Sequence, residues 1–235
     1  MKRSSLVLGL VLAMATSGLA APLELDPTFD GDGRRSIFVP GALPAGPAPG
    51  IAVTGDDKIV TTGRYSGPYR FNTDGTLDGT FGTGGVASGS IIDGRAMALQ
   101  ADGSVLVVHG GAVGGTTQVI LVTRWDATGV IDSTFGTAGT VTINLGPLDS
   151  YGEAIAVQPD GKILVAGWVG FPEDLLMVRL ESDGTLDATF GTGGIAITDL
   201  GTEEGLLDML LLPDGRIIAV GVYDESFFDG TSFPT

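Results

Sequence analysis

The chain contains no cysteine, and His109 is the only histidine among its 235 residues. Disulfide bonds and thiolate chemistry are therefore excluded, and one histidine cannot build a histidine-rich metal site. A Ser-His-Asp arrangement would have to use His109, and no Gly-x-Ser-x-Gly nucleophile motif accompanies it. We expect His109 to be a strand-end residue, and the motifs predict no catalytic residue.

Basic residues are scarce, since 12 Lys and Arg stand against 28 Asp and Glu for a formal net charge of −16. A field of this sign repels nucleic acid and anionic lipid, and it favours cations or basic partners. A simpler alternative is that the acidic groups only keep the protein in solution. We predict no nucleic-acid partner.

Long apolar runs are also missing, apart from residues 6–15. Lys2 and Arg3 precede this run and the small residues SGLA follow it, which is typical of a secretory signal over residues 1–20. The run is too short to span a bilayer, and no later segment could anchor the chain. We expect an exported protein (periplasmic, cell-surface or extracellular) without a transmembrane anchor.

Glycine, in contrast, is abundant, and many of the 39 glycines belong to a nine-residue phrase that occurs four times. The copies LDPTFDGDG, LDGTFGTGG, IDSTFGTAG and LDATFGTGG are 52, 54 and 55 residues apart, starting at Leu25, Leu77, Ile131 and Leu186. A second phrase, PDGKILVAG from Pro159, recurs with a similar period. Such self-similarity is the signature of a repeat fold in which each repeat is one supersecondary unit.

Each repeat has the pattern of four short strands. Residues 154–167, AIAVQPDGKILVAG, hold two alternating apolar runs around a Pro-Asp-Gly turn, which predicts a β-hairpin. TVTINL at 140–145 precedes this hairpin, and LLMVRL at 175–180 follows it. No segment after residue 20 has a convincing helical period of apolar residues. We therefore predict an all-β chain of antiparallel four-stranded units.

Four-stranded units at this period favour a β-propeller, in which radially arranged blades leave few strand edges exposed. A β-solenoid is the alternative, but it usually repeats at shorter intervals. The interpretation places about four repeats of ~54 residues in one domain over 21–235, with blades at about 25–76, 77–130, 131–185 and 186–235. The last repeat is incomplete, so either a four-bladed ring closes imperfectly or the chain is part of a longer array.

The pattern LDATFGTGG, AVQPDGKILVAG and VRLESDGTLD resembles the delta-60 repeat, a family of tandem repeats in exported bacterial proteins. The resemblance covers essentially all of residues 25–235 and is clearest over 131–221. It implies a propeller-like array and brings no established activity or catalytic residues. The first repeat departs from the pattern, because Asp57 replaces the turn glycine and DGDG replaces GTGG.

Arginines at one position of the repeat are matched by aspartates eight residues later, in the pairs Arg70 and Asp78, Arg124 and Asp132, and Arg179 and Asp187. Because the guanidinium fork suits a fixed geometry, we expect repeated structural ion pairs. Regularly spaced acids also suit calcium, but the EF-hand pattern is incomplete and Asx turns explain most of them. The best calcium candidates are Asp30 and Asp32 in DGDG, and we expect no other cofactor.

The loops that vary between repeats should share one face, because adjacent strands alternate in direction. Variable loops on a rigid scaffold often carry binding sites, and aromatic side chains beside carboxylates suit a sugar, a cation or a basic protein. The candidate ligand-binding residues are Tyr151, Glu153, Trp168, Phe171, Glu173, Asp174, Glu203, Glu204, Tyr223 and Asp224. The alternative is that these acids solvate the loops while the aromatic rings pack beneath them.

Three functions are compatible with these features. The first is a non-catalytic binding or scaffold module that recognises a protein or carbohydrate, acting as a monomer or as part of a longer chain. The second is a carbohydrate hydrolase or lyase that uses two carboxylates of the variable face. The third is a purely structural part of a longer repeat array.

Overall fold

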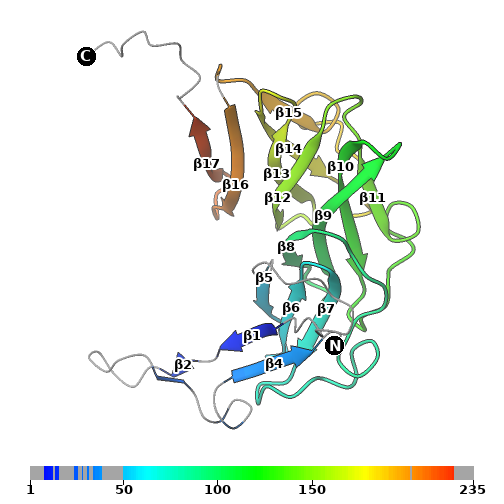
Figure 1. The fold of residues 1–235 in the computed structure, drawn as a ribbon, viewed down its shortest axis with the longest axis vertical. Coiled ribbons are helices and arrows are strands. Elements are labelled where there is room, and N and C mark those ends of the chain that lie inside the picture. Colours follow the sequence, from blue (N-terminus) through cyan, green and yellow to red (C-terminus); the bar gives the residue numbers. More distant parts are fainter. Residues whose placement is uncertain are drawn as a thin grey trace, which may run out of the picture.

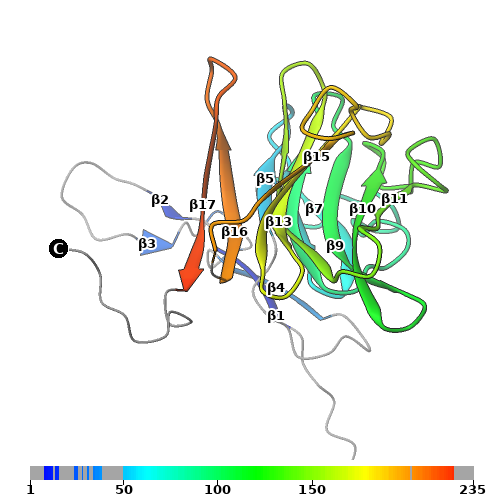
Figure 2. The same ribbon diagram turned by 90° about the horizontal axis from the view of Figure 1, so that it is seen from above.

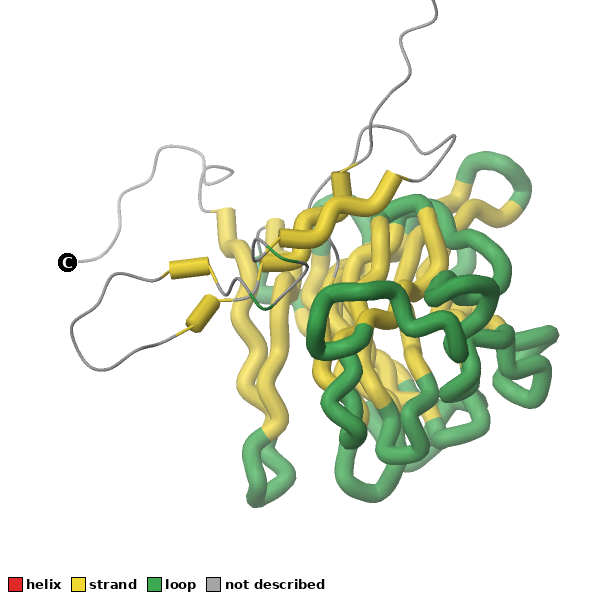
Figure 3. Tube along the Cα trace, turned by 90° about the horizontal axis from the view of Figure 1, so that it is seen from below, coloured by secondary structure: helices red, strands yellow, loops and turns green. Residues whose placement is uncertain are grey.

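The computed structural model describes residues 50–201 and 203–224, without the side chains of Tyr223 and Asp224, together with Thr28, Gly31 and four short strands near the N-terminus. The backbones of these strands are β1 (Leu8–Leu12), β2 (Met14–Ala15), β3 (Glu24–Leu25) and β4 (Arg34–Phe38). Over these ranges the chain consists of strands, turns and loops (Figure 3). In this part of the chain, no helix has the length and apolar character needed to cross a membrane.

Four antiparallel sheets follow one another along the chain from residue 50. The first sheet consists of β5 (Gly50–Val53), β6 (Ile59–Gly63) and β7 (Ser66–Phe71). The second consists of β8 (Gly94–Leu99), β9 (Val105–Val113), β10 (Thr117–Trp125) and β11 (Thr140–Ile143). The third consists of β12 (Ser150–Val157), β13 (Ile163–Val169), β14 (Asp174–Leu180) and β15 (Ile195–Thr198). The fourth is the hairpin of β16 (Glu203–Leu211) and β17 (Ile217–Asp224).

The sheets stand side by side, like blades set around an arc. The leading strand of each sheet contacts the leading strand of the next, in the order β5, β8, β12 and β16. Figure 1 shows this succession from cyan to orange, and Figure 2 shows β16 and β17 at one end of the row. The prediction of an all-β chain with four-stranded antiparallel sheets is confirmed.

The sheets are offset from the predicted blade boundaries. We predicted that residues 140–145 belong with the hairpin that follows them, but β11 pairs with the preceding strand β10, with Ile143 opposite Ile120. Likewise, β15 pairs with β14, with Ile195 opposite Val178. The four-stranded sheets therefore span 94–143 and 150–198, and the boundaries at 130 and 185 are corrected. The nine-residue phrase reverses the chain, so that the strand after the phrase pairs with the strand before it. The first backbone bridge of this pairing joins Trp125 and Ile131.

The first sheet has only three strands. A single bridge from Tyr69 to Val86 stands where β11 stands in the second sheet, so the segment after the phrase at Leu77 adds no fourth strand. The altered phrase is the one at Leu25, and strand β4 begins nine residues after Leu25, the same distance that separates Ile131 from β11. Strand β4 pairs with β1, which precedes this phrase, with Phe38 opposite Leu8.

The hairpin turns need one residue with a positive φ angle. Gly161 supplies it in the Pro-Asp-Gly turn between β12 and β13, with φ of 86°. In the first sheet this position is Asp57, which adopts φ of 61°. Aspartate tolerates the left-handed region better than most residues, so the turn forms without the glycine of the other repeats.

The phenylalanine of the nine-residue phrase is buried between consecutive sheets. Phe81 and Phe135 are fully buried. A Cβ atom on Gly184 would lie 2.9 Å from the Phe135 ring, so the absence of a side chain lets the turn of the third sheet rest on this ring. Phe190 holds the same position after the third sheet and is only half-buried. The phrase therefore joins one sheet to the next.

Replacing Phe135 with alanine should destabilise the protein by about 3–5 kcal/mol, because it removes a large ring from a packed site that cannot collapse freely. Phe190→Ala is the matched control, since it makes the same chemical change at a site that is only half-buried. We expect a clearly smaller loss for Phe190→Ala in urea unfolding followed by circular dichroism. Equal losses for both variants would contradict the role of the phrase as an inter-sheet plug.

Candidate functional site

Each sheet has two ends, and they differ in character. The hairpin turns and the nine-residue phrases lie at one end, here called the turn end, which comprises residues 54–58, 72–85, 100–104, 126–139, 158–162, 181–194 and 212–216. The other loops lie at the opposite end, here called the loop end, which comprises residues 64–65, 87–93, 114–116, 144–149, 170–173 and 199–201 together with the strand residues that adjoin them. Antiparallel pairing alone dictates this division, and it holds whichever sheet the strand after the phrase joins.

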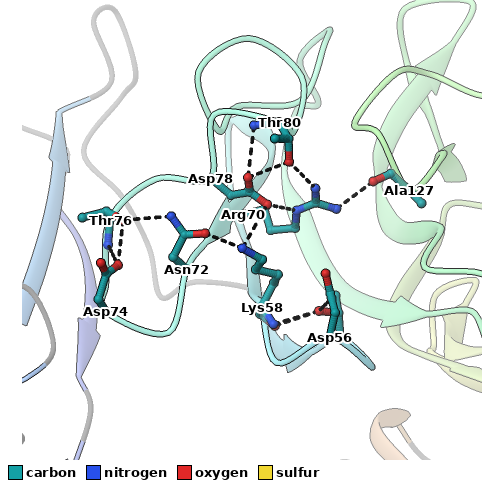
Figure 4. Close-up of polar contacts among 10 residues, drawn as sticks. Asp56, Lys58, Arg70, Asn72, Asp74, Thr76, Asp78, Thr80 and Ala127 are labelled. Carbon is teal, nitrogen blue, oxygen red and sulfur yellow. Dashed lines mark hydrogen bonds and ion pairs between the residues drawn. The ribbon is translucent and has the colours of Figure 1, made fainter.

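At the turn end, each arginine of the repeat pairs with the aspartate eight residues later. The distances are 2.8 Å from Arg70 Nε to Asp78 Oδ2, 2.8 Å from Arg124 Nη2 to Asp132 Oδ2, and 2.6 Å from Arg179 Nε to Asp187 Oδ2. Figure 4 shows the first pair, in which Asp78 Oδ1 also accepts hydrogen bonds from the backbone and side chain of Thr80. The same carboxylate thus closes the turn and fixes the arginine.

Two of these arginines also reach the next sheet. Arg70 Nη1 donates to the carbonyl of Ala127 at 2.7 Å, and Arg124 Nη1 donates to the carbonyl of Ser182 at 2.6 Å. The guanidinium of Arg124 lies 4.5 Å from the centre of the Phe135 ring, as a cation–π contact. All these groups have partners within the chain, so the turn end is built for assembly of the sheets.

The acids considered as calcium ligands have structural roles where the structure describes them. Asp74 Oδ1 accepts hydrogen bonds from the backbone and hydroxyl of Thr76, and Asp183 Oδ1 does the same for Thr185. These are Asx turns, the alternative that the sequence favoured. The best calcium candidates, Asp30 and Asp32, lie outside the described residues.

His109 is buried in the middle of β9, so the prediction of a strand-end residue is wrong. Its Nε2 lies 2.9 Å from the Thr123 hydroxyl, which in turn contacts the Thr140 hydroxyl at 2.9 Å. Burial lowers the pKa of His109, which favours the neutral ring. The histidine therefore joins β9, β10 and β11 through a hydroxyl chain and does not face the loop end as a general base.

At the loop end, an aromatic stack lies on two neighbouring strands of the third sheet. The rings of Tyr151 on β12 and Trp168 on β13 lie 4.1 Å apart at 24°. Arg95, near the start of β8, lies 5.8 Å from the Tyr151 ring and pairs with Glu153 at 2.7 Å. Arg95 also pairs with Asp93 at 2.6 Å. The second and third sheets are thus bridged beside the stack by a charge pair that sequence reasoning missed.

Beyond the stack, carboxylates converge from the third and fourth sheets. Asp174, Asp199 and Glu204 have oxygen atoms within 4.8 Å of one another, and Glu204 is fully buried. Burial and then the charges of Asp199 and Glu204 raise the pKa of Asp174. Burial and then the charges of Glu203 and Glu153 raise the pKa of Glu173. Within the described residues, these three oxygen donors are the group that could hold a divalent cation.

The candidate residues of the variable face lie at one end of the third and fourth sheets. Glu203 and Glu204 pair along the backbone with Asp224 and Tyr223, whose side chains lie outside the described part. Phe171 is 82% exposed at the tip of the loop between β13 and β14. Asp199 was missed because a single aspartate after a short strand carries no signal of its own.

Comparison with protein families places a match on the third sheet. A family model described as "Domain of unknown function (DUF5122) beta-propeller" matches residues 158–190. The matched segment runs from the turn after β12 to the phenylalanine of the last phrase, and it supports a β-propeller-like repeat. No curated protein matches the chain.

The raised pKa of Asp174 makes a testable difference to stability. A carboxyl group whose pKa is raised by folding stabilises the folded state below its ordinary pKa, and this contribution is lost as the pH rises through the raised value. In buffer with a chelator, we therefore expect Asp174→Asn to raise the melting temperature at pH 7 by a few degrees, with the difference vanishing near pH 4.

Asp187→Asn is the control, because we expect it to change the melting temperature in the opposite direction. Hydrogen bonds from Lys162 and Thr189 hold the pKa of Asp187 well below its usual range, so its contribution is present at neutral pH and is lost as the pH falls. This variant should melt at a lower temperature than the parent at pH 7. A lower melting temperature for Asp174→Asn at pH 7 would show that its negative charge does not oppose folding.

Proposed function

We propose that this protein is an exported, non-catalytic binding module that recognises a cationic partner, a lysine- or arginine-rich protein segment, through its loop end. The observation that carries the proposal is a set of carboxylates near the half-buried Tyr151–Trp168 stack. Folding raises the pKa of two of them, Glu173 and Asp174. The neighbouring charges oppose one another, and a bound cation would relieve that repulsion.

The aromatic stack supports the same partner. Lysine and arginine side chains bind favourably to the faces of Trp and Tyr, and Arg95 of the chain itself already lies over Tyr151. The overall charge of −16 would steer a basic partner towards the protein. The turn end is a poor alternative, because its arginines and aspartates are engaged with one another.

The wider assignment is also a proposal. We propose that the chain belongs to the delta-60 repeat family, which the repeated phrases support, and that its sheets are blades of a β-propeller, which the match over 158–190 supports. Export rests on the basic start, the apolar run at 6–15 and the small residues before Ala21.

A second candidate function is carbohydrate hydrolysis or lysis at the carboxylate group. The raised pKa of Asp174 beside Asp199 and Glu204 favours it, because acid–base catalysis uses carboxyl groups with separated pKa values. Release of reducing sugar or of unsaturated product from polysaccharides, abolished by Asp174→Asn, would establish this function in place of binding.

Binding to an oligolysine peptide tests the leading proposal. The variant Glu173→Gln/Glu203→Gln removes two charges at the loop end and should weaken binding by about tenfold at low salt, equivalent to about 1.4 kcal/mol. The difference should shrink as salt screens the charges. Fluorescence titration, with Trp168 as one reporter, gives the dissociation constants.

Asp102→Asn/Asp160→Asn is the matched control, since it removes the same charge from two hairpin turns and keeps the side-chain oxygens that accept from Ser104 and Lys162. It should bind almost as well as the parent. If both double variants lose the same affinity, net charge alone is responsible and the loop end is not the site.

A further inference from the structure

The strands of the inner sheets have two faces, one for each neighbouring sheet. On β9, Val105 and Val107 pack with Val60 of the first sheet, whereas Leu106 and Val108 pack with Ile155 of the third. Side chains alternate between the faces because successive residues of a strand point in opposite directions. We call the face toward the preceding sheet the backward face and the face toward the following sheet the forward face. Every inner sheet therefore buries both faces.

The forward face of the fourth sheet is exposed. Ile218 and Val220 stand 54 residues after Leu164 and Ala166, at the same positions of the repeat. In the third sheet this face is covered by β16, and Leu164 and Ala166 are fully buried. In the fourth sheet Val220 is 60% exposed, and Leu210 on β16 is 61% exposed. These apolar residues, with Ile218 and Val222, form the forward end face.

The backward face of the first sheet is exposed in a complementary way. Ile51 and Val53 of β5 occupy the repeat positions of Met97 and Leu99 of β8. Met97 and Leu99 pack into the core between the first and second sheets. In contrast, Ile51 and Val53 are 62% and 63% exposed. They form the backward end face.

The two end faces are the unmatched halves of one repeated interface. At each inner junction, a leading strand lays its backward face against the forward face of the preceding sheet, as β8, β12 and β16 do. We propose that a second copy of this chain completes the junction, with β5–β6 of each copy packed on β16–β17 of the other. Two such junctions, related by a twofold axis, close the first to fourth sheets of both copies into one ring.

The continuity of this contact with the existing junctions favours a second copy over an unrelated partner. The covering element must offer β-branched or aliphatic side chains on a strand with the spacing of Ile51 and Val53, and the chain carries that element at its other end. Burying exposed apolar surface of this kind drives association. Figure 1 shows β5 and β17 at opposite ends of the arc, so within one copy the two faces stand apart.

Sedimentation velocity of the full chain over a hundredfold concentration range tests the proposal. We expect a dimer that dissociates on dilution, and we expect Val220→Lys and Val53→Glu each to shift the chain to monomer. Each junction joins the forward end face of one copy to the backward end face of the other, so mixing the two variants should restore dimers. In the mixed dimer, lysine faces glutamate at one junction, and both positions of the other junction keep valine.

Val130→Lys is the matched control, because Val130 is 51% exposed at the turn end, away from both end faces, and the variant should remain dimeric. Circular dichroism reports whether each variant folds, and if Val220→Lys is unfolded, Val53→Glu tests the same junction from its other side. A parent chain that is monomeric at every concentration would overturn the proposal. Equal dissociation by Val130→Lys, or no recovery on mixing two folded variants, would overturn it as well.

Discussion

The contact on which the architecture depends is an arginine held in three ways at once. Arg124 pairs with Asp132, lies over the Phe135 ring and donates to the carbonyl of Ser182 in the next sheet. Pairing fixes the guanidinium fork, and the ring shields it from water, so its hydrogen bond to the neighbouring turn has a defined direction. Arg70 makes the same three contacts with Asp78, the Phe81 ring and the carbonyl of Ala127, so the second and third sheets are set on their predecessors in the same way.

The arginine contacts constrain the turn end of the sheets, whereas the loops of the loop end can vary in sequence. The turn end is committed to assembly, because Lys162 as well as Arg179 is engaged by Asp187. At the loop end, Arg95 and Glu153 form one ion pair between sheets, and the carboxylates of Asp174, Asp199 and Glu204 lie within 4.8 Å of one another. The loops can therefore vary in sequence while the contacts at the turn end stay the same.

The backbone at the loop end still has defined anchors. Asp149 accepts the backbone N–H of Gln118 at 2.7 Å, and the N–H of Glu204 donates to the carbonyl of Glu173 at 2.9 Å. Each bond links a loop of the third sheet to a strand of a neighbouring sheet, and together they fix the backbone that carries the acidic residues. The proposed binding site and the proposed ring would use different parts of the same sheets, since one lies at the strand ends and the other on the outer sheet faces.

The sequence by itself determined the all-β class, the repeat, the hairpin turns and the pairing of Arg124 with Asp132, because these follow from strand alternation, turn chemistry and a spacing of eight residues. Only the tertiary structure decided that β11 pairs with the preceding strand β10 and not with the hairpin that follows it, because the folded nine-residue phrase turns the chain back toward β10. It alone also brought Asp174, Asp199 and Glu204 together. Their approach depends on how two sheets pack, and no local pattern encodes a contact between side chains on separate sheets.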